Sequence, residues 1–239
     1  LDRRRHAPAE AHESIAAAAV RQRHDGRFTE QATEMREAVT TDMANEDVPW
    51  DWREAAGPAA LGLLRHSSLM DLIVIGEREP IDCGKAPSWT AGELALSASC
   101  PVLVLPEKSK LFDAQAPALV AWDGSAESCH ALRSAVPFLR KAGQVFLASV
   151  AERDRDDRDL PALGGADYLA RHEISCEVVE IGKPDDNGVA GALNEAAALR
   201  KCGLVVMGAY GRTRLAERVF GGVTRGMLED VRVPLLMTH

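Results

Sequence analysis

Short apolar runs alternate along the second half of the chain with longer stretches in which apolar residues recur every three or four positions. The runs predict buried strands over residues 118–122, 144–150, 203–208 and 233–238. After the first run, Leu132 and Leu139 fall on one face of a predicted helix, and Ser125 occupies the position of its N-cap. A further helix is predicted over about 184–200. Strands that alternate with helices of this length indicate parallel βαβ units in an α/β fold, with a sheet covered on both faces.

The first half of the chain repeats this order of elements at a nearly constant offset. Residues 50–76 and residues 176–208 both run strand, glycine, helix, strand, glycine. The closing glycines of these two stretches lie 132 positions apart. The prolines near the start of the apolar runs 100–106 and 233–238 lie 133 positions apart. Two offsets that agree within one residue predict tandem repeats of one domain.

We place the two predicted domains at residues 1–110 and 117–239, and the first is incomplete at its N-terminus. Residues 1–48 read as helical, with an amphipathic stripe at Phe28, Ala32, Met35, Val39 and Met43. The first repeat is therefore expected to lack its opening strand, helix and strand. Either the chain is truncated or this repeat is incompletely represented, and the sequence leaves both alternatives open.

Composition and charge narrow the class of protein. Hydrophobic residues make up 46% of 239 residues, which is enough for a sizeable core. The net charge of −8 and a pI of about 5.4 disfavour a nucleic-acid partner. No apolar stretch approaches the ~20 residues of a membrane span, and the opening residues lack the apolar core of a signal peptide. The five cysteines stand at scattered positions with no CxxC pair, namely Cys83, Cys100, Cys129, Cys176 and Cys202. We expect a soluble cytoplasmic protein with no membrane partner.

Two strand ends in the second repeat carry candidate binding residues. Asp123 follows the run 118–122, and Gly208 ends the run 203–208. Ligands of open parallel sheets bind beyond the carboxyl ends of the strands, so neighbouring strand ends here would flank one crevice. Gly208 and Gly211 lack a Cβ atom and would let a ligand approach the backbone closely.

The glycines that follow favour an anion. Gly221 and Gly222 precede a short predicted helix, whose free N–H groups and dipole attract negative charge, and Thr224 adds a hydroxyl. Positive charge is supplied nearby by Arg212, Arg214, Arg218 and Arg225. These parts suit a di- or triphosphate. The alternative is an ordinary glycine-rich connection with solvated arginines, and DGS at 123–125 is also a good turn and capping sequence.

Other classes of site find less support in the sequence. There is no GxxxxGK[ST] loop and no GxGxxG fingerprint after a strand, which disfavours P-loop NTPases and dinucleotide dehydrogenases. The seven histidines show no metal-ligand spacing, so no metal site is predicted. No combination of nucleophile, base and orienting residue can be assembled, so no catalytic residue is assigned.

The segments ALVAWDGSAES at 118–128 and VVMGAYGRTRLAERVFGGVTRGMLEDVRVPLLMTH at 205–239 resemble the universal stress protein family in its tandem two-domain bacterial form. The motif of this family is a glycine, two residues, a glycine, nine residues and a glycine, which Gly208, Gly211 and Gly221 match. The resemblance implies a doubly wound α/β fold with a five-stranded parallel sheet (adenine nucleotide alpha hydrolase-like), often paired through the last strand.

The resemblance also implies an ATP site, with or without Mg²⁺. In ATP-binding members the aspartate after the first strand lies near adenine and ribose, and the glycine loop surrounds ribose and phosphates. The positions of this chain that match are Ala121, Asp123, Val150, Met207, Gly208, Gly211, Gly221, Gly222, Val223 and Thr224.

Two departures from the family pattern weaken the implied site. Gly222 stands where nucleotide-binding relatives have serine or threonine, and a lost hydrogen bond to a phosphate costs roughly 1.5–3 kcal/mol, or about 10- to 150-fold in affinity. In the first repeat Glu79 takes the place of the second glycine, so no nucleotide is expected there.

Two hypotheses about function follow. The first is a stress-response regulatory protein that binds ATP or a related adenine nucleotide in its second repeat, with at most slow hydrolysis. The alternative is an interaction or dimerisation module of the same fold that binds no nucleotide. Partners expected on either view are a paired repeat within the chain or a second copy in a homodimer.

Overall fold

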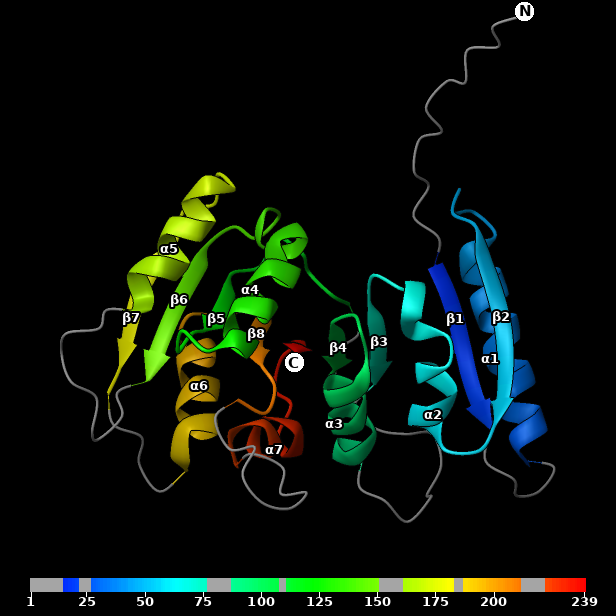
Figure 1. Cartoon of the computed structure of the whole chain (residues 1–239). Helices are drawn as coiled ribbons and strands as arrows, with labels where there is room; N and C mark the ends of the chain where they lie inside the picture. The colour runs from blue at the N-terminus through cyan, green and yellow to red at the C-terminus, as the bar shows by residue number, and fades with distance from the viewer. Residues whose placement is uncertain are drawn as a thin grey trace, which may run out of the picture. The chain divides into compact units, whose positions relative to one another are not determined.

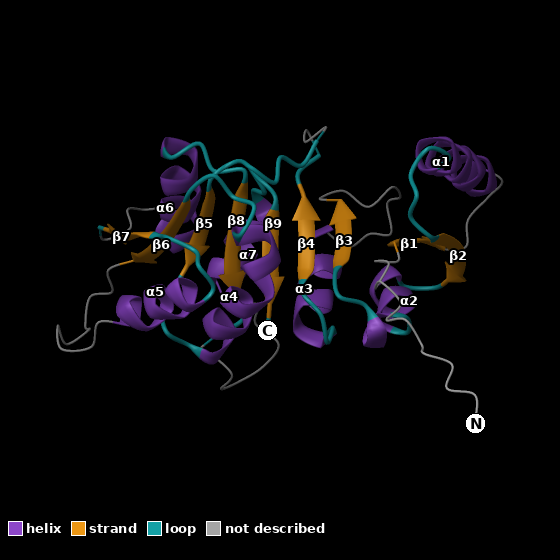
Figure 2. Ribbon diagram, turned by 90° about the horizontal axis from the view of Figure 1, so that it is seen from above, coloured by secondary structure: helices purple, strands orange, loops and turns teal. Residues whose placement is uncertain are grey.

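The computed structural model describes residues 15–21, 27–76, 87–107, 111–150, 161–182, 187–211 and 222–239. The chain divides between Leu63 and Leu64 into two compact units, which are described separately here. Most elements of both units are labelled in Figure 1, and β9 is labelled in Figure 2.

The first unit contains a small parallel sheet. Its elements are β1 (Ile15–Arg21), α1 (Arg27–Met43) and β2 (Trp50–Ala56), and α2 (Ala59–Leu64) follows them. The two strands pair in parallel over their full length, from Ile15 opposite Trp50 to Arg21 opposite Ala56. The predicted helix over the stripe from Phe28 to Met43 is confirmed by α1.

The prediction that residues 1–48 are wholly helical is wrong at β1. The strand has the sequence IAAAAVR, whose four alanines favour a helix by intrinsic propensity. Pairing with β2 along seven positions overrides that preference, since tertiary partners routinely outweigh local propensity.

The second unit carries the larger sheet. Its elements in chain order are η1 (Ser67–Leu69), β3 (Ile73–Gly76), α3 (Pro87–Ser97), β4 (Val102–Leu105), β5 (Ala118–Ala121), α4 (Ala126–Leu139), β6 (Val145–Val150), α5 (Pro161–Arg171), β7 (Glu177–Ile181), α6 (Gly188–Leu199), β8 (Leu204–Gly208), α7 (Gly222–Glu229) and β9 (Leu235–Thr238). Each strand predicted in the second half of the chain is confirmed, and so are the helices after 118–122 and before 203–208.

The seven strands of this sheet lie in the order β3-β4-β9-β8-β5-β6-β7. Neighbours are parallel except β4 and β9, which run antiparallel with Leu103 opposite Leu236. The expected five-stranded parallel sheet is therefore present as β9-β8-β5-β6-β7, and it continues through β9 into two strands from the first half of the chain.

The order of elements in the first unit matches part of this sheet. Strands β1 and β2 are parallel neighbours joined through α1, as β6 and β7 are parallel neighbours joined through α5. The described residues of the first half hold counterparts of β6 to β9 but none of β5 and α4. The repeat organisation and the incompleteness of the first repeat stay predictions.

Helices cover both faces of the larger sheet. Helices α4 and α5 pack together on one face, and α6 lies on the other (Figure 2). The strands between them are buried, as at Leu119, Leu147 and Val206, each no more than 1% exposed. Burying such a side chain contributes about 1.5–3 kcal/mol, so the apolar runs that predict the strands also supply the core.

The connections create a switch point between β5 and β8. The chain leaves β5 through α4 towards β6, and it returns from β7 through α6 to β8, on the other side of β5. The connection from β5 leads through α4 to β6, whereas the connection from β8 leads through α7 to β9, so the two leave the neighbouring carboxyl ends of β5 and β8 in opposite directions and open a crevice at this edge of the sheet.

Candidate functional site

A pocket of about 640 Å³ lies at the carboxyl ends of β5, β6 and β8. The first turns of α4, α6 and α7 complete its wall. Its volume falls within the range of ~300–1,000 Å³ that is usual for small-molecule sites. Three helix N-termini at one pocket favour negative charge there, because each first turn presents N–H groups with no partner inside the helix.

The structure brings nine of the ten predicted site residues together in this pocket. They are Ala121, Asp123, Val150, Met207, Gly208, Gly211, Gly222, Val223 and Thr224. Gly221 lies outside the described residues, as do Arg212, Arg214 and Arg218. Because β5 pairs directly with β8, the ends that carry Asp123 and Gly208 are neighbours, as the crevice argument requires.

Asp123 has a structural role in the turn between β5 and α4. Its Oδ1 accepts a hydrogen bond from the backbone N–H of Ser125 at 2.9 Å, and Gly124 between them has a φ of +75°. Ser125 in turn caps α4, because its Oγ accepts the backbone N–H of Ser128 at 3.2 Å. The predicted cap is confirmed, and the turn fixes where the Asp123 carboxylate lies in the pocket.

Gly208 is required by packing at the end of β8. A Cβ atom at this position would lie 2.6 Å from the carbonyl carbon of Glu127 and 2.6 Å from the backbone nitrogen of Ser128. Both atoms belong to the first turn of α4, so only glycine lets that helix approach the strand so closely. This finding gives Gly208 a structural reason that is independent of any ligand.

The loop after β8 is held to α7 by Thr224. The Thr224 side chain is buried, and its Oγ1 accepts the backbone N–H of Tyr210 at 3.2 Å. Tyr210 has a φ of +61°, which is uncommon for a residue other than glycine, and burial raises the pKa of its hydroxyl well above the usual range. Tyr210 therefore stays protonated, and the Thr224 oxygen that sequence reasoning assigned to a phosphate already holds the loop.

Gly222 begins α7 with free space around it. A Cβ atom there would meet no heavy atom within 4 Å, so a serine or threonine side chain fits at this position. The absence of a hydroxyl at this position is therefore not a consequence of crowding among the described residues.

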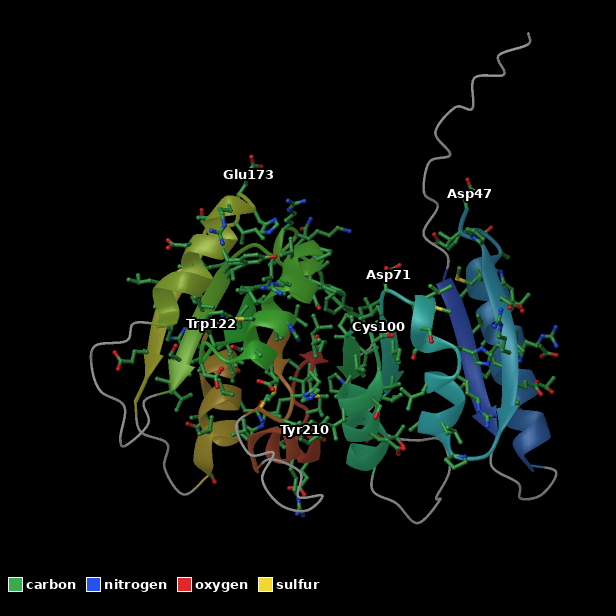
Figure 3. The ribbon with its side chains drawn as sticks, viewed as in Figure 1. Asp47, Asp71, Cys100, Trp122, Glu173 and Tyr210 are labelled. Atoms are coloured by element: carbon green, nitrogen blue, oxygen red, sulfur yellow. The ribbon has the colours of Figure 1, made fainter. Side chains whose placement is uncertain are left out.

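Sequence reasoning missed two parts of the pocket wall. One is the first turn of α6, which contributes Asn187, Gly188, Val189, Ala190 and Leu193. The alternation of strands and helices could have indicated it, since every helix that leads back to a parallel strand starts at the carboxyl edge of the sheet. The other part is a set of residues that lie close in sequence to predicted positions, namely Trp122, Ser125, Glu127, Ser128, Ala148, Tyr210 and Gly226. Trp122 and Tyr210 are labelled in Figure 3.

The charges on the described pocket wall are negative. Asp123 and Glu127 line the pocket, and no lysine or arginine does so in the ranges that the structure describes. Arg225, which sequence reasoning placed near the phosphates, instead pairs with Glu229 at 2.7 Å on the exposed face of α7. The described wall thus attracts anions through helix N-termini while two carboxylates oppose them.

Other classes of site find no support in the described part of the chain. It contains no group of three or more His, Cys, Asp or Glu side chains that could hold a metal ion. None of its helices has both the length and the apolar character needed to cross a bilayer.

Comparisons with known proteins agree with this architecture. The sequence profile of the universal stress protein family matches residues 117–239, which is just over half of the chain. A search of curated protein sequences found no match.

Solved structures of other proteins resemble this chain in fold over more than residues 117–239, which the family profile matches. A universal stress protein from Archaeoglobus fulgidus DSM 4304 has a TM-score of 0.73 at 16% identity, over 95% of this chain and 87% of its own. A candidate universal stress protein from Pseudomonas aeruginosa UCBPP-PA14 has a TM-score of 0.61 at 15% identity, over 94% of this chain and 82% of its own. At these identities the likeness concerns the fold alone. The profile match, the pocket at the switch point and the glycine spacing agree with one another. The chain therefore belongs to the universal stress protein family, a family of stress-response proteins.

Proposed function

We propose that the pocket at the ends of β5 and β8 binds ATP or a related adenine nucleotide, with or without Mg²⁺, and that the chain regulates a stress response through this binding. The observation that carries the proposal is the convergence of three helix N-termini on one pocket of about 640 Å³. Apolar wall residues at Ala121, Val150 and Met207 offer a surface for a base, and the polar turn at Asp123 offers hydrogen bonds to a sugar.

Hydrolysis is slow or absent in this proposal. Phosphoryl transfer is accelerated mainly by cationic groups that neutralise charge as it develops on the transferred group. The described wall presents carboxylates at Asp123 and Glu127, and Tyr210 stays protonated. The chain therefore acts by binding, which shifts an equilibrium between conformations or assemblies.

Calorimetric titration with Mg-ATP tests the proposal. We expect a Kd below about 100 µM for the wild type, which corresponds to about 5.5 kcal/mol of binding free energy. Asp123→Asn keeps the acceptor for the Ser125 N–H while it removes the charge, and Gly211→Leu fills the pocket. Gly211→Leu should abolish the heat, whereas Asp167→Asn, on the exposed side of α5, should leave it unchanged.

A second candidate function is a module that pairs with itself or a partner and binds no nucleotide. Two observations favour it: Gly208 is explained by helix packing alone, and Gly222 lacks a hydroxyl although space for one exists. The absence of heat at high micromolar protein with every adenine nucleotide would favour this candidate over the first.

A further inference from the structure

Glu127 lies beside the glycines of the pocket, although it is not among the ten site positions that the family resemblance implies. It belongs to the first turn of α4, whose N-cap is Ser125, and its side chain is half-buried and lines the pocket. A Cβ atom placed on Gly208 would lie 2.8 Å from the Glu127 Cβ, and one placed on Gly211 would lie 3.4 Å from its Oε2. The side chain thus extends from the end of β8 towards Gly211, and its carboxylate would be in van der Waals contact with a side chain placed on Gly211.

The groups that face this carboxylate offer it no positive charge in the described part of the chain. Asp123 and the hydroxyl of Ser125 face it from the connection between β5 and α4, and the Ser125 Oγ would lie 3.7 Å from a Cβ atom placed on Gly211. From the loop after β8 come the backbone of Gly211 and the neutral Tyr210. From α7 and α6 come glycines and aliphatic or hydroxyl side chains, together with Asn187.

A carboxylate in this position acts differently on different adenine ligands. The proposed function rests on the helix N-termini of the pocket as the anion-binding part, and Glu127 lies in the first turn of one of these helices, α4. A like charge a few ångströms away in a partly buried site opposes each phosphate charge, whereas it leaves a neutral nucleoside unaffected. The energy of this electrostatic repulsion depends on the charge of the ligand and not on its shape, which distinguishes the repulsion from a steric effect.

We propose that Glu127 is a specificity-determining residue that penalises phosphate charge in the pocket beside Gly208 and Gly211. The inference rests on the proposed function and narrows its ligand. The carboxylate shifts the preference of the site towards an adenine ligand of low charge, a nucleoside or its monophosphate, and away from a triphosphate that carries no cation. The residue does not need to contact the base or the sugar for this effect.

A purely structural role for Glu127 also exists and makes a different prediction. An acidic residue in the first turn of a helix stabilises the helix through the dipole, whatever ligand is bound. If that were its whole role, replacing the carboxylate would lower the melting temperature slightly and change the affinities of all adenine ligands by the same factor.

The test compares adenosine, AMP and ATP, titrated calorimetrically in EDTA at 50 mM and at 500 mM salt. Glu127→Gln removes the charge with little change of shape, and Glu127→Asp keeps it. The matched control is Glu229→Gln, in the last turn of α7 and exposed, outside the pocket wall. Thermal unfolding of each variant is measured alongside.

We expect Glu127→Gln to tighten ATP binding about tenfold at low salt, AMP binding by less, and adenosine binding by under twofold. The gain for ATP should shrink at high salt, and Glu127→Asp should bind ATP no more than about twofold more tightly than the wild type. An equal change for all three ligands, or no gain for ATP, would overturn the role of Glu127 while leaving the nucleotide site intact. If no ligand binds to either the wild type or Glu127→Gln, the proposed function fails, and this inference fails with it.

Discussion

Replacing Gly208 with alanine tests the packing that shapes the pocket, independently of any ligand. The new Cβ would lie 2.6 Å from two backbone atoms of α4, at Glu127 and Ser128, which is far inside normal contact distance. Backbone atoms cannot rotate away as a side chain could, so α4 must move away from β8. Overpacking of this kind costs about 1–3 kcal/mol, of which about 0.5 kcal/mol is recovered because alanine restricts the unfolded chain.

We therefore expect Gly208→Ala to lower the free energy of unfolding of the larger unit by about 0.5–2.5 kcal/mol. In a unit of this size that change lowers Tm by roughly 1–10 °C. Because the chain has two units, a global probe is insufficient. Urea unfolding is best followed by hydrogen exchange in peptides that cover β5 and β8, which report on this sheet alone.

Gly222→Ala is the matched control, because a Cβ there meets nothing within 4 Å. It should raise the free energy of unfolding by about 0.5 kcal/mol, because alanine restricts the unfolded chain there too and meets no clash. The reasoning is refuted if Gly208→Ala is as stable as the wild type, or if the two variants lose the same stability. Either result would mean that the close approach of α4 to β8 is not what requires glycine.

Three further predictions follow from single contacts. Gly222→Ser adds a hydroxyl in open space at the start of α7 and should tighten ATP binding about tenfold by calorimetry; unchanged affinity would mean that the phosphates lie elsewhere. Ser125→Ala removes the cap of α4 and should cost about 1 kcal/mol in urea unfolding, whereas Ser125→Asp should restore most of it; equal losses would exclude capping as the cause. Burial raises the pKa of the Cys202 thiol to about 11, so at pH 8 roughly one molecule in a thousand carries the thiolate and labelling by a disulfide reagent should need unfolding. Rapid labelling of Cys202 in the native protein would contradict that burial.

The sequence was sufficient to predict the strands of the larger sheet and part of the wall of the pocket, for one physical reason. Strands buried on both faces are short continuous apolar runs, and the residues just beyond such runs lie at the edge where ligands bind. Asp123 and Gly208 could thus be assigned to one crevice before any coordinates were known. Neither assignment required a long-range contact other than the pairing of β5 with β8.

Three features could not be predicted because they depend on partners far away in the sequence. The strand β1 exists through its pairing with β2, while its alanines alone indicate a helix. The joining of β4 to β9 depends on which edges meet, and apolar runs carry no such information. The position of Glu127 beside Gly211 follows from the close approach of α4 to Gly208, which only the packed structure reveals.

The most direct test of the central claim is a titration of the labelled chain with Mg-ATP, followed by the backbone amide signals in NMR. The account predicts shifts concentrated at the ends of β5 and β8 and in the first turns of α4, α6 and α7, with Asp123, Gly211 and Thr224 among the largest. No shifts at millimolar nucleotide, or shifts confined to the opposite edge of the sheet near Gly143 and Ser175, would contradict it.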